Sequence, residues 1–253
     1  MSPGLIGLIV FVCVFGGALA GMALRTVLPE HHLSDATKDV VKLVTGLIAT
    51  LAALVLGLLV ASSKGSFDAV NEAFRQSAAR IIVLDRTLAQ YGPETRALRE
   101  GLKKAFAARI EQLFPEDSSR PVEPGSAQAT AALEELQQRI RMLAPQNEAQ
   151  RSLQARALDV AETVAQTRWL AIEAQEAVIP PAFLGILVFW LTAMFASFGL
   201  FAPRNAMTVA ALCLGALSLA AAVFLIEEMN DPIGGVIAIS SAPMYKALGF
   251  LGQ

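Results

Sequence analysis

Residues 43–61 read LVTGLIATLAALVLGLLVA, and residues 62–91 continue as SSKGSFDAVNEAFRQSAARIIVLDRTLAQY. The first stretch has no charged residue and the length of about 20 residues with which a helix crosses a bilayer. In the second stretch, apolar or small residues recur at alternating steps of three and four: Phe67, Val70, Phe74, Ser77, Ile81, Leu84 and Leu88. This stripe is typical of a helix with one apolar face. Because no proline occurs between Leu43 and Pro93, we predict one helix that continues from the membrane into a polar domain and ends near Gln90.

Three further stretches have the length and composition of a membrane span. They run from about Gly4 to Leu24, from Phe183 to Ala202 and from Ala206 to Ile226. Ala18-Leu19-Ala20 resembles a signal-peptidase site, but no basic residue precedes the apolar run, so we interpret this stretch as a retained span. Only Pro203-Arg204-Asn205 separates the last two stretches, which predicts an antiparallel hairpin. The predicted fold class is an all-α integral membrane protein with four transmembrane helices and a helical extramembrane domain between the second and third.

The composition agrees with a membrane protein. Of the 253 residues, 55% are hydrophobic and 17% are charged, whereas about 25% of residues are charged in an average soluble domain. The net charge of −2 and the lack of any basic cluster argue against nucleic-acid binding. We predict four segments: two spans in residues 1–62, a polar helical domain in 63–179, two spans in 180–226, and an acidic turn with a short interfacial helix in 227–253.

The polar domain contains three more predicted helices, each with a narrow apolar stripe. The stripe residues of the first are Leu98, Leu102, Phe106, Ile110 and Leu113. Those of the second are Leu133, Leu136, Ile140 and Leu143, and those of the third are Leu153, Val160, Val164 and Ile172. We expect these stripes to pack together in a bundle, and part of a stripe to meet another subunit.

Residues 43–61 carry a face of small side chains, made by Gly46, Thr50, Ala53, Gly57 and Ala61. Such a face lets membrane helices approach closely. The alternative is a pore wall, where small and hydroxyl side chains leave room for hydrated ions. The pore-lining candidates are then Thr45, Thr50, Ala53 and Gly57, with Ser62, Ser63 and Lys64 at the mouth. No charged residue lies within any span, which argues against a proton-coupled pump.

An acidic segment follows the fourth span and reads Glu227-Glu228-Met229-Asn230-Asp231-Pro232-Ile233-Gly234-Gly235. Two carboxylates at a helix C-terminus are unfavourable, because the helix dipole is negative there, so they need partners. The alternatives are an interfacial cluster with salt bridges, a cation site and a charged pore vestibule. Calcium is a candidate cation, because it prefers oxygen ligands. The candidate residues are Glu227, Glu228, Asn230 and Asp231, and the identity of any metal stays open.

No enzyme motif is present in the sequence. A nucleophile elbow, a phosphate-binding glycine loop, a Cys-x-x-Cys pair and a zinc-binding His-Glu-x-x-His helix are all missing. We therefore predict no catalytic residue and no cofactor other than calcium. An even number of spans puts both termini and the polar domain on one side of the membrane. Basic residues near the spans divide almost equally between the two sides, and we assign the polar domain and both termini to the cytoplasmic side of the inner membrane.

The order of two spans, a helical insert, two spans and an acidic segment resembles the bestrophin-like family. The matching stretches are Gly46 to Val60, Asn71-Glu72-Ala73, Leu88 to Glu94 and Glu227 to Ser241. The resemblance implies an oligomeric anion channel with a central pore and a calcium clasp after the last span. Glu227, Glu228 and Asp231 lie where that clasp is expected, although the long aspartate-rich run of calcium-gated animal bestrophins is not present here.

The resulting hypothesis is a homo-oligomeric ion channel in the lipid bilayer, a tetramer or pentamer with anion selectivity slightly favoured. Its pore is lined by the second span. The alternative is a non-conducting membrane scaffold or sensor protein that carries a helical-bundle domain. Ion flux through reconstituted protein separates the two.

Overall fold

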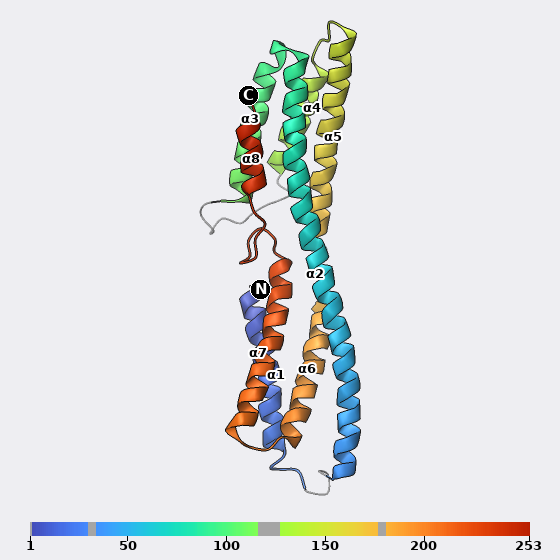
Figure 1. The fold of residues 1–253 in the computed structure, drawn as a ribbon, viewed down its shortest axis with the longest axis vertical. Coiled ribbons are helices and arrows are strands. Elements are labelled where there is room, and N and C mark those ends of the chain that lie inside the picture. Colours follow the sequence, from blue (N-terminus) through green and yellow to red (C-terminus); the bar gives the residue numbers. More distant parts are fainter. Residues whose placement is uncertain (1, 30–33, 116–126, 177–180) are drawn as a thin grey trace. The chain divides into compact units, whose positions relative to one another are not determined.

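All regular structure in the described part of the chain is helical (Figure 1). The computed structural model describes residues 2–29, 34–115, 127–176 and 181–253. The elements in chain order are α1 (Pro3–Leu24), α2 (Asp35–Tyr91), the short 3-10 helix η2 (Pro93–Thr95), α3 (Arg96–Leu113), α4 (Ala127–Arg141), α5 (Glu148–Glu176), α6 (Pro181–Phe201), α7 (Ala206–Met229) and α8 (Ala242–Phe250). Helices α1, α2, α6 and α7 are long and apolar enough to cross a membrane. The predicted fold class is therefore confirmed.

The chain divides into two compact units. Met1–Gly65 and Val178–Asn230 form the first, which we call the membrane unit. Ser66–Ala177 and Asp231–Gln253 form the second, which we call the polar unit. The boundary predicted between residues 179 and 180 lies outside the described residues.

α2 is a single helix of 57 residues, which corresponds to a length of roughly 85 Å. The boundary between the two units falls after Gly65, so α2 contributes residues to both. It ends at Tyr91, because the next residue, Gly92, has a backbone φ of +144°, which residues other than glycine rarely adopt. The Thr95 hydroxyl donates a hydrogen bond of 2.5 Å to the Leu88 carbonyl, one of the last carbonyls of the helix. The predicted continuity of this helix is confirmed.

A close crossing of α1 and α6 organises the membrane unit. A Cβ atom on Gly21 would overlap the Ala196 carbonyl of α6, and one on Gly199 would overlap the Ala18 carbonyl of α1. Gly17, one turn before Gly21, also faces α6, so the two glycines form the G-x-x-x-G pattern that brings membrane helices together. α1 also packs along α7, and the three helices lie side by side (Figure 1).

The connection between α6 and α7 has four residues, Ala202 to Asn205, one more than predicted, because α6 already ends at Phe201. Asn205 caps α7, because its Oδ1 accepts a hydrogen bond of 2.8 Å from the backbone N–H of Thr208. Arg204 Nη2 donates to the Met22 carbonyl near the end of α1. These bonds satisfy backbone groups that helix ends leave without partners.

The core of the polar unit contains residues from each predicted stripe, together with residues that were not predicted. α2 contributes Ile81, Leu84 and Leu88, which are 6%, 0% and 1% exposed. All five predicted stripe residues of α3 are buried, namely Leu98, Leu102, Phe106, Ile110 and Leu113. The cluster is completed by Ile140 of α4, by Ala157, Ala161 and Val164 of α5, and by Met244 and Ala247 of α8. The bundle packing of the stripes is therefore present in the structure.

α8 lies against α3 within the polar unit (Figure 1). Its buried face packs into the common core, and three basic side chains hold the residues that follow it. Arg86 and Arg99 both donate to the Gln253 carbonyl, each at 2.9 Å, and Lys103 donates to the Leu251 carbonyl at 2.9 Å. The interfacial position of this helix stays a prediction.

Candidate functional site

The spanning part of α2 has the largest open surface of the four spans. Only 17% of its most apolar 18 residues are buried, compared with 33% for α1. Thr50, Ala53 and Gly57 are all exposed on it. A Cβ atom on Gly46 or Gly57 would meet no atom within 4 Å. Within the described part of the chain, these residues of the small-residue face do not pack against another helix.

The seven predicted pore-lining residues differ in exposure and do not all lie on the same side of α2. Thr45 and Ser63 are 7% and 1% exposed, and their spacing puts them on the same side of α2 as the buried Leu59. Ser62 is exposed, but it lies about 140° around the helix from Gly57. The open small-residue face thus contains Thr50, Ala53 and Gly57 and, at its end, the exposed Lys64, together with Gly46 and Ala61. We call this set the open face of α2.

Two exposed features give the open face its chemistry. The Thr50 hydroxyl donates a hydrogen bond of 3.0 Å to the Gly46 carbonyl, so its lone pairs remain available as acceptors. Lys64 supplies the cation at the polar end of the face. The leucines Leu54 and Leu58, which are 71% and 68% exposed, lie on the adjacent side of the helix and suit lipid contact.

The four acidic-segment candidates fall into different environments. In the membrane unit, Glu228 is only 4% exposed, whereas Glu227 and Asn230 are half-buried. In the polar unit, Asp231 is exposed and forms a turn, because its Oδ1 accepts a hydrogen bond of 3.0 Å from the Gly234 N–H. Within the described residues, no group of three or more His, Cys, Asp or Glu side chains is arranged to hold a metal ion. A calcium role for these residues stays a prediction.

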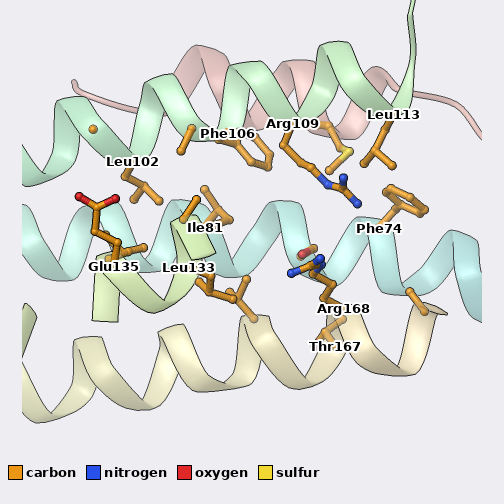
Figure 2. A pocket seen from close by; sticks show the side chains of 18 of the residues that line it. Phe74, Ile81, Leu102, Phe106, Arg109, Leu113, Leu133, Glu135, Thr167 and Arg168 are labelled. Atoms are coloured by element: carbon orange, nitrogen blue, oxygen red, sulfur yellow. The ribbon is translucent and has the colours of Figure 1, made fainter. Parts of the chain in front are cut away.

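A pocket lies inside the polar unit, and the sequence predictions do not include it (Figure 2). It has a volume of about 310 Å³. Its walls come from five helices, α2, α3, α4, α5 and α8, represented by Phe74, Phe106, Leu133, Val164 and Met244. Figure 2 shows Arg109 of α3 and Arg168 of α5 directing their guanidinium groups into the space between these helices. Apolar walls with two convergent cations are an unusual combination in a bundle core.

The sequence contains a signal for this pocket. Arg168 lies four residues after Val164 and four residues before Ile172, and thus on the same side of the helix. It therefore occupies a position of the predicted stripe where an apolar residue is expected. Arg109 lies three residues after Phe106 and therefore also borders a stripe. Burial, and then the nearby positive charge of Arg168, lower the pKa of Arg109 to about 10. Burial also lowers the pKa of Arg168.

These features together define a class of protein: a membrane protein with four helical spans and a helical domain between the second and third. The family model for the bestrophin-like domain matches residues 12–244. This chain therefore belongs to the bestrophin-like family. No protein with curated annotation matches it.

Several solved structures share the fold. A crystal structure of a bacterial bestrophin homologue from Klebsiella pneumoniae with one substitution has a TM-score of 0.65 and 18% identity, covering 95% of this chain and 99% of that one. Another substituted form of that homologue has a TM-score of 0.66 and 17% identity, with 96% of each chain covered. A crystal structure described only as a membrane protein has a TM-score of 0.65 and 16% identity, covering 96% of this chain and 99% of that one.

Proposed function

We propose that this protein is a homo-oligomeric ion channel whose pore is lined by the open face of α2. Four or five copies surround the axis, with anions slightly favoured over cations. The polar unit and both termini lie on the cytoplasmic side of the inner membrane. The observation that carries the proposal is the face of small side chains at Gly46, Thr50, Ala53 and Gly57, which is exposed within the described residues of a single chain.

The chemistry of this face suits ion passage. Small side chains keep the axis wide, so an ion retains much of its hydration shell and avoids the cost of entering an apolar medium. Thr50 adds a hydroxyl oxygen to the wall. Lys64 at the end of the face raises the local concentration of anions. Membership of the bestrophin-like family supports the same function, because the resemblance implies an oligomeric anion channel.

Flux through liposomes tests the proposal directly. The full chain is reconstituted, and chloride and potassium flux are followed with ion-selective dyes. We expect flux of at least one ion, with chloride faster than potassium, and a tetrameric or pentameric mass in the detergent complex. Absence of flux of both ions across the tested pH range, with and without calcium, would favour the scaffold or sensor alternative instead.

Cysteine accessibility then tests which side of α2 faces water. In a background with Cys13 and Cys213 replaced by alanine, Gly57→Cys and Ala53→Cys should react with a charged methanethiosulfonate reagent and lose conductance. Leu58→Cys is the matched control, because Leu58 lies about 100° around the helix from Gly57 and is 68% exposed. If Leu58→Cys reacts and blocks while Gly57→Cys does not, the open face does not line the pore.

A further inference from the structure

The end of α1 lies beside the connection between α6 and α7 (Figure 1), and each of these two segments carries an arginine. Arg25 directly follows α1, and its Nη1 donates a hydrogen bond to the Ala202 carbonyl after the end of α6. Arg204 lies between α6 and α7, and its Nη2 donates to the Met22 carbonyl of α1. Each arginine thus reaches across to the segment that carries the other one, so the two guanidinium groups lie over the same junction of helices.

The positive charge of these two arginines is not balanced within the described part of the chain. Arg25 and Arg204 are exposed, and no described carboxylate forms an ion pair with either of them. The nearby lysines in the first turns of α2 differ, because Lys38 and Lys42 lie 2.9 and 3.7 Å from carboxylate oxygens of neighbouring aspartates. A guanidinium group has five N–H donors. Both arginines therefore keep donors for an anion beside their bonds to backbone carbonyls.

A hollow of about 370 Å³ adjoins the arginine pair. The residues that line it come from the end of α1, the α6–α7 connection and the start of α7: Met22, Ala23, Arg204, Asn205, Ala206 and Val209. Four of these side chains are apolar, and Arg204 and Asn205 supply polar groups at one side. Such a hollow suits a molecule that has one anionic and one apolar part.

The surroundings favour a lipid over an anion from solution. Arg25 follows a span directly and Arg204 lies between two spans, so both guanidinium groups belong at the level of the lipid headgroups. Three apolar side chains close to them in sequence, Leu24, Val27 and Met207, are 50%, 78% and 80% exposed. A free phosphate ion would leave these side chains in water, whereas a phospholipid covers apolar surface with its acyl chains.

We infer that Arg25 and Arg204 bind the phosphate of an anionic phospholipid, the upper part of whose acyl chain lies in the hollow between α1 and α7. Guanidinium groups bind phosphate through charge-assisted, bidentate hydrogen bonds. Basic pockets between membrane helices recognise anionic headgroups by the same chemistry. A zwitterionic headgroup carries its own cation, so two arginines attract it less strongly. The inference does not depend on ion conduction by this protein.

Native mass spectrometry of the delipidated full chain in detergent tests the inference. The probes are dioleoyl phosphatidylglycerol, which has a net negative charge, and dioleoyl phosphatidylcholine, which has the same acyl chains and no net charge. We expect saturable binding of phosphatidylglycerol and at least about tenfold weaker binding of phosphatidylcholine. Millimolar inorganic phosphate should not displace the bound lipid. Equal affinity for the two lipids, or displacement of phosphatidylglycerol by phosphate, overturns the inference.

Substitutions then assign the binding to the two arginines. Arg25→Gln and Arg204→Gln should each raise the Kd for phosphatidylglycerol about fivefold, which is the usual contribution of one cation near an anionic headgroup. Lys42→Gln is the matched control, because it removes a cation at the same end of the unit that already pairs with Asp39. This control should leave the Kd within about twofold of the unsubstituted protein. An unchanged Kd in both arginine variants contradicts the assignment.

A photo-crosslink in the unsubstituted protein does not depend on the folding of any variant. The probe is phosphatidylglycerol with a diazirine near the glycerol end of one acyl chain, and the labelled peptides are identified by mass spectrometry. We expect labels in residues 22–27 and 202–209, suppressed by excess unlabelled phosphatidylglycerol but not by phosphatidylcholine. Labels spread evenly over all four spans, or equal suppression by the two lipids, would contradict the proposed site.

Discussion

Arg99 of α3 and Asp85 of α2 form a bidentate ion pair, in which Nε lies 2.9 Å from Oδ1 and Nη2 lies 2.8 Å from Oδ2. The side chain of Asp85 is only 1% exposed, and its Oδ2 also accepts a hydrogen bond of 3.3 Å from the Gly252 N–H. The hydrogen bonds to Asp85 raise the pKa of Arg99. One buried carboxylate therefore joins α2, α3 and the residues after α8.

Replacement of Arg99 by methionine should strongly destabilise the polar unit. The substitution leaves the Asp85 carboxylate buried without its cation, which costs about 3 kcal/mol of unfolding free energy. Thermal unfolding in detergent, followed by circular dichroism, measures the loss. Arg96→Met is the control, because its ion pair with Glu100 is exposed; it should change the unfolding free energy by less than about 0.5 kcal/mol. Equal effects of the two substitutions would show that the buried pair has no special role.

Replacement of Gly21 by leucine should disrupt the membrane unit. No side chain fits between Gly21 and the Ala196 carbonyl, so α1 and α6 must separate. We expect a loss of about 2 kcal/mol or more. Gly16→Leu on the same helix meets no atom within 4 Å and should be tolerated. Protein yield and thermal stability in detergent compare the two variants, and similar losses in both would argue against the close crossing.

Replacement of Arg109 by glutamine should stabilise the protein at neutral pH. Burial lowers the folded-state pKa of Arg109 to about 10, below the usual value of an arginine, so the charged form is less favourable in the folded state. After allowance for solvent screening of this half-buried group, we expect a gain of about 1 kcal/mol. As the pH rises above about 10, the unfolded chain binds more protons at this group than the folded one, because the folded-state pKa is the lower of the two. The contribution of Arg109 to stability therefore rises with pH in this range.

The advantage of Arg109→Gln should therefore shrink as the pH increases above about 10. Melting temperatures of the two proteins between pH 8 and 11 measure this difference. Arg151→Gln serves as the reference for a fully charged surface arginine. An advantage that grows with pH, or a loss of stability at pH 8, would contradict the expected cost of the buried charge.

The predicted calcium role of Glu227, Glu228, Asn230 and Asp231 can be tested through stability, because a bound ligand stabilises the folded state. If these residues bind calcium, addition of millimolar calcium after chelator treatment should raise the melting temperature, and Asp231→Asn should abolish the rise. Differential scanning fluorimetry in detergent measures both proteins. A shift of less than about 2 °C in the unsubstituted protein would contradict a calcium site.

Several features of this protein follow from local sequence. Chain length and apolar composition define the spans, because a helix must satisfy its backbone groups internally to cross a bilayer. The continuity of α2 follows from the stripe from Phe67 to Leu88 and from the lack of proline between Leu43 and Pro93. The end of α2 follows from Gly92-Pro93. Each of these features depends on interactions between residues that are a few positions apart, so the sequence alone is sufficient to predict it.

The candidate site required the tertiary structure. Thr45 and Thr50 look equivalent in the sequence, but only packing decides that Thr45 is buried and Thr50 is open. Likewise, the sequence shows an arginine, Arg168, at a position in the stripe of α5 where an apolar residue is expected. That Arg168 and Arg109 line the same pocket depends on how α5 and α3 are arranged in the bundle (Figure 2). Local periodicity determines which helices form and which side of each is apolar. Long-range packing decides which residues of different helices come together. The number of residues that separate two positions in the sequence does not determine the distance between them in the fold.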